Sequence, residues 1–273
     1  MLRSLKALEK CTIGATDGDI GQVKDLYFDD HDWVVRYLIV DTGSWLSSRK
    51  VLISPISIHT PDWQTNRLPA AVARDQVKNS PEIDTDKPVS RQHELQYLDH
   101  YGYPNYWGGT GLWGAGMYPF AMVPGYAGLP VGVAERNLAI QESVQAERMR
   151  HRDDDPHLRS GEAVVGYHLH VTDGEVGHVE GFLVDDETWA IRYLVINTSN
   201  WWLGHQVLIA PQWISGIEWS DQSVTVDLSR EAVKTAPVYE PSVALDRQRE
   251  TSLYSHYGLT PYWTAPATPE REV

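Results

Sequence analysis

Two closely similar octapeptides lie 156 residues apart in this chain: Thr16-Asp17-Gly18-Asp19-Ile20-Gly21-Gln22-Val23 and Thr172-Asp173-Gly174-Glu175-Val176-Gly177-His178-Val179. Outward from them, the same offset relates Asp29-Asp30 to Asp185-Asp186 and Arg36-Tyr37-Leu38 to Arg192-Tyr193-Leu194. Between Thr16 and Ile58, 18 of 43 positions are identical to their partners. Because a repeat of this length is a whole domain, the sequence predicts two similar units joined by a linker.

The repeat also sets the expected domain boundaries. Its register begins where Leu2-Arg3-Ser4 matches Leu158-Arg159-Ser160, and it ends where Tyr106-Trp107 matches Tyr262-Trp263. We therefore assign residues 1–107 to repeat 1, 108–156 to a linker, 157–263 to repeat 2 and 264–273 to a tail. The linker is rich in Gly and Pro, which predicts irregular structure, and its aromatic residues suggest that parts of it dock on a barrel.

Composition excludes several classes of protein. The net charge of −14 opposes binding to nucleic acid and to anionic membranes, which both attract Lys and Arg. A single cysteine, Cys11, allows no intramolecular disulfide and is typical of a reducing compartment. The sequence shows neither a secretory signal nor an apolar run long enough to span a bilayer. We expect a cytoplasmic protein with no integral membrane segment.

The first half of each repeat has the pattern of short β-strands. Residues 33–40 and 189–196 are β-branched and aromatic with one Arg inside, which is typical of a strand buried on both faces. Short strands follow at 51–53 and 207–209, and further ones are expected at 213–219 and 223–227. Closely spaced short strands with Gly and Pro between them predict a small β-barrel or sandwich.

The second half of each repeat has helical patterns. One or two turns are expected at 73–78 and 229–234, with Ser229 as an N-cap. Longer helices are expected from Ser90 to Tyr101 and from Asp246 to Tyr257, each followed by Gly, a common C-cap residue. The fold class is therefore mainly β, with two tandem small barrels that are each followed by short α-helices.

These motifs resemble the PRC-barrel family. The Thr-Asp-Gly octapeptide, the Asp-Asp turn, the Arg-Tyr-Leu strand and Val51-Leu52-Ile53-Ser54-Pro55 carry the resemblance, and it extends over nearly the whole chain in both repeats. It implies a roughly six-stranded barrel that binds other proteins and has no catalytic site of its own. The family's module also occurs in the H subunit of photosynthetic reaction centres and in a ribosome maturation factor. This chain lacks the membrane anchor of the first and the companion domain of the second, so neither partner is carried over.

Two arginines stand inside apolar strands. Arg36 and Arg192 can each form an anion site, or an intradomain ion pair with the acidic turn nearby. The ion pair is favoured because isolated buried charge is costly. The expected structural pairs therefore involve Arg36 with Asp29 and Asp30, and Arg192 with Asp185 and Asp186.

Two motifs raise the question of metal. His168 and His170 share one face of a predicted strand, where they can hold zinc or copper if a third ligand arrives, or serve as surface residues. Asp17-Gly18-Asp19 lacks the EF-hand pattern and is more typical of a turn. We assign no metal site and no cofactor, with His168 and His170 as the weak candidates.

Large aromatic residues in the loops are the expected partner-binding positions. Trp45, Trp201 and Trp202 lie in the loops between predicted strands. They can be exposed anchors for a protein partner or for the other barrel, or they can fold back over the barrel mouth. Their presence in both copies suits a homodimer or an intramolecular barrel–barrel pair.

Three functions remain open. The first is a non-enzymatic protein-interaction or scaffold module whose partner is unknown, because the chain has no Gly-x-Ser-x-Gly, phosphate loop or His-Glu-x-x-His motif. The second is a protein that binds a metal or small ligand in the inter-barrel cleft or on the His168/His170 face. The third and weaker hypothesis is a hydrolytic or acid–base enzyme in the inter-barrel groove.

Overall fold

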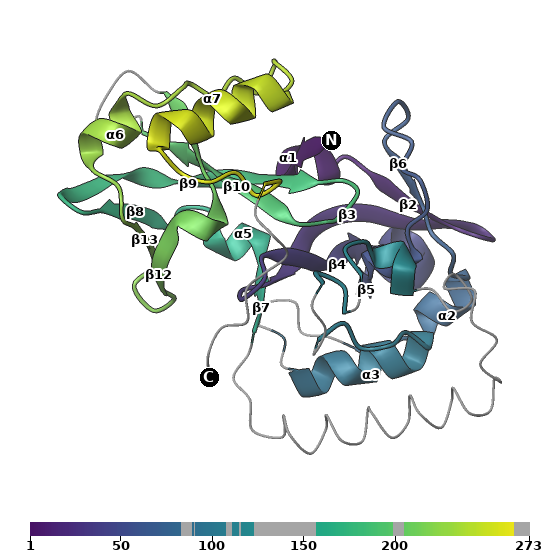
Figure 1. The fold of residues 1–273 in the computed structure, drawn as a ribbon. Coiled ribbons are helices and arrows are strands. Elements are labelled where there is room, and N and C mark those ends of the chain that lie inside the picture. Colours follow the sequence, from purple (N-terminus) through teal and green to yellow (C-terminus); the bar gives the residue numbers. More distant parts are fainter. Residues whose placement is uncertain are drawn as a thin grey trace. The chain divides into compact units, whose positions relative to one another are not determined.

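The computed structural model describes residues 1–82, 89, 91–107, 111–114, 116–122, 157–198 and 205–264 (Figure 1). Strands dominate the described elements, which confirms the mainly β fold class. The chain forms two units, each discontinuous in sequence. The N-terminal unit holds Lys6–Ser160 with Glu187–Ala190, and the C-terminal unit holds Met1–Leu5, Gly161–Asp186 and Ile191–Val273. These units differ from the contiguous boundaries expected at 1–107 and 157–263, because each one takes a short segment from the opposite repeat.

The N-terminal unit contains a mixed sheet with the order β5-β4-β3-β2-β6, and β7 pairs with β3 outside this path. Its strands are β2 (Thr12–Ala15), β3 (Gly18–Asp29), β4 (Val34–Asp41), β5 (Lys50–Ile53), β6 (Arg67–Pro69) and β7 (Leu158–Ser160). Its α-helices are α2 (Arg74–Lys78) and α3 (Arg91–Tyr101), and α1 (Leu5–Leu8) begins at its edge. Three 3₁₀ turns complete it: η1 (Gly43–Leu46), η2 (Pro55–Ser57) and η3 (Pro119–Met122).

The C-terminal unit repeats this plan. Its sheet has the order β11-β10-β9-β8-β13-β12, and β1 pairs with β9 outside this path. Its strands are β1 (Leu2–Ser4), β8 (His168–Val171), β9 (Gly174–Asp185), β10 (Ile191–Asn197), β11 (Gln206–Ile209), β12 (Ile214–Glu218) and β13 (Ser223–Val226). Its helices are α5 (Gly161–Val164), α6 (Arg230–Lys234) and α7 (Arg247–Tyr257), with the 3₁₀ turn η4 at Pro211–Trp213. Among the described strands of both sheets, no pairing joins the two ends of the path into a closed ring.

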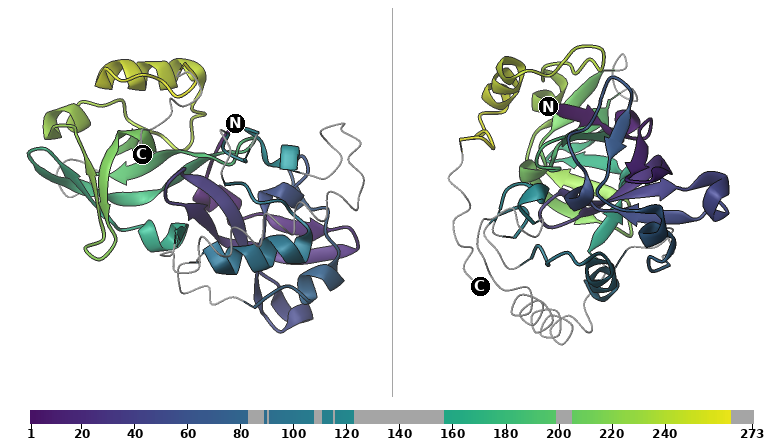
Figure 2. Two further views of the ribbon diagram at one scale, coloured as in Figure 1. Left: turned by 60° about the horizontal axis from the view of Figure 1, so that its bottom comes forward. Right: turned by 90° about the vertical axis from the view of Figure 1, so that its right-hand side faces the viewer.

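The apolar strands β4 and β10 are mostly buried, as their composition predicts. Seven of the eight residues of β4 are buried, from Val34 to Val40. A helix covers one face of each sheet: the Tyr97 ring of α3 lies 5.9 Å from the Tyr37 ring of β4, and the Tyr254 ring of α7 lies 6.4 Å from the Tyr193 ring of β10. Figure 2 shows each of these helices beside its own sheet. Burial on both faces explains why these strands read as continuous apolar runs.

A pair of glycines sets the path of the long strands β3 and β9. Gly21 and Gly177 have φ values of 158° and 127°. A Cβ at Gly21 would lie 1.9 Å from the carbonyl oxygen of Asp41, and one at Gly177 would lie 2.2 Å from that of Asn197. The backbones approach so closely that only glycine fits, which explains why both octapeptides carry it.

A carboxylate from each octapeptide caps the N-terminus of a short helix, α2 or α6. Asp17 Oδ1 accepts the backbone N–H of Arg74 at 2.8 Å, and Asp173 Oδ1 accepts that of Arg230 at 2.7 Å. Each carboxylate thereby satisfies a first-turn N–H that has no partner within its helix. This is the turn and capping role rather than that of a calcium ligand. The predicted N-cap role of Ser229 is also present, because its Oγ accepts the N–H of Ala232.

The first strand of each repeat lies in the sheet of the opposite repeat. β1 pairs with β9, and β7 pairs with β3 (Figure 1). Within the N-terminal unit, the segment 187–190 adds a further pairing: Val34 forms a bridge with Ala190, and the Val35 N–H donates to the carbonyl of Trp189 at 2.8 Å. Both units are therefore completed by segments from the other half of the sequence.

Candidate functional site

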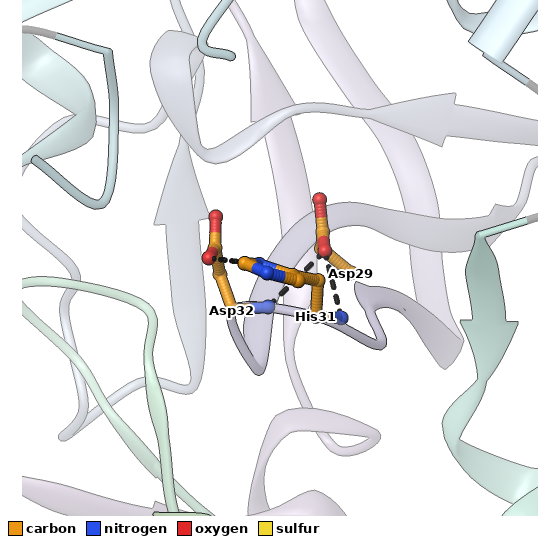
Figure 3. Close-up of side chains that lie close together, drawn as sticks. All are labelled: Asp29, His31 and Asp32. Atoms are coloured by element: carbon orange, nitrogen blue, oxygen red, sulfur yellow. Dashed lines mark hydrogen bonds and ion pairs between the residues drawn. The ribbon is translucent and has the colours of Figure 1, made fainter. Parts of the chain in front are cut away.

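The acidic turn between β3 and β4 is organised by a buried carboxylate. Asp29, at the end of β3, is 3% exposed, and its Oδ1 accepts the backbone N–H groups of His31 at 3.0 Å and Asp32 at 3.2 Å (Figure 3). The turn ends at Trp33, which has a φ of 55° and stacks on Phe28 with 5.1 Å between ring centroids. The turn thus holds two carboxylates and an imidazole close together.

The Arg36 guanidinium lies against this turn and is buried. Its Nη2 lies 3.1 Å from Asp32 Oδ2 and 3.7 Å from Asp29 Oδ2, and its Nη1 donates to the Leu112 carbonyl. Its guanidinium carbon lies 3.7 Å from the centre of the Tyr106 ring and 4.9 Å from that of Trp113. Carboxylates and aromatic faces together replace the water that a buried guanidinium loses.

The same turn is the one group of potential metal ligands among the described residues. Ligand atoms of Asp29, His31 and Asp32 lie within 4.8 Å of one another. However, Asp29 already accepts two backbone N–H groups, both carboxylates face Arg36, and His31 Nδ1 pairs with Asp32 Oδ1 at 2.7 Å. With a guanidinium in place, the geometry is that of a closed ion pair rather than a cation site.

Repeat 2 builds a related network in the C-terminal unit. Arg192 Nη2 lies 3.3 Å from Asp185 Oδ2, and its guanidinium carbon lies 4.2 Å from the centre of the Tyr262 ring. The buried carboxylate of Glu250 accepts the hydroxyls of Tyr193 at 2.8 Å and Tyr262 at 3.1 Å. Burial, and then the negative charge nearby, raises the pKa of the Tyr193 hydroxyl far above its usual value. Arg247 Nη1 lies 3.1 Å from Glu250 Oε2 and supplies a second positive charge. Each charged group of the network therefore has a partner inside the C-terminal unit, which indicates a structural role.

Two of the expected ion-pair residues have other partners. Asp30 Oδ2 pairs with Arg159 Nε at 2.8 Å, and Asp186 Oδ2 pairs with Arg3 Nε at 3.1 Å. The expectation that Asp30 pairs with Arg36 and Asp186 with Arg192 is wrong, because strands β7 and β1 bring Arg159 and Arg3 to these carboxylates. In the sequence, only the Leu-Arg-Ser segment shared by the two repeats pointed to these arginines.

The predicted histidine face is present on β8. His168 and His170 are both exposed, while Leu169 between them is buried. His168 Nδ1 lies 2.7 Å from Glu175 Oε1. Within the described part of the chain, neither histidine belongs to a group of three close metal ligands. The geometry supports the surface reading of this pair.

Of the three predicted tryptophan anchors, the structure describes Trp45. Trp45 is half-buried: its Nε1–H donates to the Ile20 carbonyl, and the Arg74 guanidinium carbon lies 4.2 Å from the centre of its ring. This favours the alternative in which the indole folds back over the sheet. Trp201 and Trp202 lie outside the described residues.

An exposed apolar cluster, which sequence reasoning missed, lies at the end of the described linker segment. Met117, Tyr118 and Phe120 are 45%, 38% and 41% exposed, and the Tyr118 and Phe120 rings stack with 5.2 Å between centroids. The segment is fixed to the N-terminal unit by Trp113, which is fully buried and donates its Nε1–H to the Thr188 carbonyl at 2.8 Å. We call Met117, Tyr118 and Phe120 the aromatic knuckle.

The C-terminal unit carries a groove of about 260 Å³. It lies between α7 and the segment that precedes it. Its lining is mainly apolar, with Glu240 and Arg249 as its charged residues, and the remaining lining residues are Leu208, Pro237, Val238, Tyr239, Val243, Leu245, Ser252 and Leu253.

Comparison with known proteins gives a partial match. Residues 7–63 match the family model of the PRC-barrel domain, a stretch that begins within α1 and contains β2 to η2 of repeat 1. No curated protein matches the chain. Every helix among the described residues is too short or too polar to cross a bilayer.

Proposed function

We propose that this chain is a non-enzymatic protein-interaction module of two PRC-barrel repeats, and that it acts in the cytoplasm. The family match to residues 7–63 supports the first barrel, and the shared octapeptide and the matching sheet order extend the proposal to repeat 2. The acidic composition supports a protein partner rather than nucleic acid.

The aromatic knuckle carries this proposal. Aromatic residues and Met are enriched where proteins meet, and a large exposed apolar group on a soluble protein marks an interaction site. The stacked rings of Tyr118 and Phe120 present a rigid surface at low entropic cost, because the buried Trp113 anchors the segment behind them.

The test compares matched variants of the tagged protein in capture from its own cells. We expect Tyr118→Ser with Phe120→Ser to lose a specific captured protein while the fold, followed by circular dichroism, is unchanged. The control, Val165→Ser with Leu259→Ser, removes exposed apolar side chains elsewhere and should retain the captured protein. Equal capture by all three proteins would contradict a role for the knuckle. Trp201→Ser with Trp202→Ser tests the two predicted anchors in the same way.

The groove of the C-terminal unit favours a second candidate function, the binding of a small apolar ligand. Its volume is at the lower limit for ligand pockets, and its mainly apolar lining with two charged groups is the usual composition. Native mass spectrometry of protein purified from its own cells checks this candidate. A bound molecule that is lost on Leu253→Trp, which fills the groove, is the expected result; identical spectra without added mass would oppose it.

A further inference from the structure

The exchanged strands occupy equivalent places in the two sheets. Leu2, Arg3 and Ser4 pair with Asp185, Val184 and Leu183, and Leu158, Arg159 and Ser160 pair with Asp29, Phe28 and Tyr27. Subtracting the repeat offset from the first register gives the second, since 185 − 156 = 29. Each sheet therefore contains the same slot for a Leu-Arg-Ser strand, and each slot is filled by the opposite repeat.

Side chains of each slot contact the side chains of the Leu-Arg-Ser strand that occupies it. In the N-terminal unit, Leu158 is fully buried in a cluster with Tyr27 and Val89. The Nε of Arg159 lies 2.8 Å from Asp30 Oδ2, and the Ser160 hydroxyl donates to Asp25. The slot thus provides an apolar pocket and two carboxylates, in addition to the backbone hydrogen bonds of a strand pair.

The slot in the C-terminal unit shares the arginine site. Arg3 Nε lies 3.1 Å from Asp186 Oδ2, as Arg159 does from Asp30. Gly181 stands where the other sheet has Asp25, and Asp186 Oδ1 also pairs with the ammonium group of Met1.

The chain crosses from one unit to the other directly after each exchanged strand. Ser160 ends β7 in the N-terminal unit, and Gly161 begins α5 in the C-terminal unit. Leu5 and Lys6 form the corresponding crossing after β1. A strand cannot fill its slot without bringing its own repeat along, so occupation of the slots joins the two repeats.

We propose that these two slots form a protein-binding site whose partner is the opposite repeat, and that strand exchange, rather than the linker at 108–156, holds the two repeats together. The chain is then a fused heterodimer whose halves complete one another.

The decisive experiment is a disulfide that forms only if the strands are exchanged. In a Cys11→Ala background, Arg3→Cys with Val184→Cys places two cysteines at directly opposite positions of β1 and β9. The matched control, Arg3→Cys with Phe28→Cys, tests the pairing that residue 3 would make in the sheet of its own repeat. A protease site inserted between Glu142 and Ser143 in both variants allows the halves to be separated.

The intact chain is oxidised with glutathione disulfide, then denatured, cleaved and run without reductant. We expect the first variant to keep its halves linked at full mass and the control to release them. The proposal would be overturned if the halves of the first variant separate and the control instead forms a disulfide within its N-terminal fragment. Because the bond forms before cleavage, neither fragment needs to fold alone.

A charge exchange then tests what the slot recognises. After native cleavage, we expect the wild-type halves to co-elute, and Arg159→Glu to weaken their association on the order of 30-fold or more, as the loss of one partner of a part-buried ion pair does. Asp30→Arg in the same chain should restore most of it. Arg67→Glu, which breaks the Asp19 pair inside repeat 1, is the control and should leave co-elution unchanged. Equal weakening by both substitutions, without rescue, would refute recognition by the slot.

Discussion

At the scale of single residues, the buried arginines show what local sequence can and cannot predict. The sequence placed Arg36 beside an acidic turn, and Asp29 is its partner in the structure. The rings of Tyr106 and Trp113, which cover the guanidinium, lie 70 or more residues away in the chain. No local pattern specifies which distant aromatic residue will desolvate a charge, so this part of the site required the structure.

Truncation of the two arginines should have unequal effects. Arg36→Ala leaves the Asp29 carboxylate buried without its counter-ion, and we expect a loss of about 3–5 kcal/mol in the free energy of unfolding. Arg192→Ala is the matched control, because the side chains of Arg192 and Asp185 are 16% and 18% exposed and water can replace the lost contact; here about 1–2 kcal/mol is expected. Urea unfolding followed by circular dichroism measures both, and equal losses would show that burial of the pair is not decisive.

At the scale of secondary structure, prediction succeeded where residues at the ends of an element mark its limits. The helix expected from Asp246 to Tyr257 is α7, which begins after the Asp246 cap and ends at Gly258 with a φ of 66°. The strands expected near 213–219 and 223–227 are β12 and β13. The three-residue strands β1 and β7 could not be predicted, because a tripeptide carries too little pattern to show a period.

The glycine of the octapeptide offers a sharp test within one strand. Gly177→Ala forces a Cβ against the Asn197 carbonyl at a backbone φ that side chains rarely adopt, so we expect a loss of about 2–4 kcal/mol in stability. Gly181→Ala, in the same strand, meets nothing within 4 Å and should change stability by less than about 0.5 kcal/mol. Thermal unfolding of both variants checks this. Similar melting temperatures would mean that the close backbone approach relaxes without cost.

The capping role of Asp173 at α6 can be tested by removing its carboxylate or only its charge. Asp173→Ala removes the acceptor for the Arg230 N–H and should cost about 1 kcal/mol, the usual value of a helix cap. Asp173→Asn keeps an acceptor oxygen and should lose less. Asp17→Ala, at the equivalent place before α2, should match Asp173→Ala. Urea midpoints compare the three, and stabilisation of the wild type by added calcium would contradict the capping role.

At the scale of the whole molecule, buried tyrosines predict alkaline instability. Burial is the largest cause that raises the pKa of Tyr101 and Tyr254 to about 12, from 10.0. A raised folded-state pKa means that the folded protein binds more protons above pH 10, so stability is constant below pH 10 and falls from there to about pH 12. Each such tyrosine contributes a slope of up to about 1.4 kcal/mol per pH unit.

Urea unfolding between pH 8 and pH 11.5 measures this slope. Tyr254→Phe should make the decline shallower, because a tyrosine with a raised pKa is removed. A flat profile up to pH 11.5 would contradict the burial of these hydroxyls. The slope is independent of any uniform stability loss that the substitution itself causes.

The duplication could be predicted at this scale, but the partnership of the strands could not. Both repeats begin with Leu-Arg-Ser, and both sheets offer a carboxylate at the equivalent position, Asp30 or Asp186. The Leu-Arg-Ser sequence therefore matches both sheets, and the sequence alone does not say which sheet each strand joins. The structure shows that the chain passes from one unit to the other at Leu5 and at Gly161, directly after each of these strands.

This arrangement affects folding during synthesis. While the ribosome is making the chain, Tyr27–Asp29 of β3 can pair with β4 on one side, but the strand that occupies their other side in the structure, β7, is absent until Ser160 has been translated. At a synthesis rate of about 5–20 residues per second, the interval after residue 107 lasts roughly 3–10 s. An emerging first repeat is thus exposed to pairing with a nascent neighbour on the same message, and slowing translation across 108–156 should increase intertwined chains at the expense of monomers.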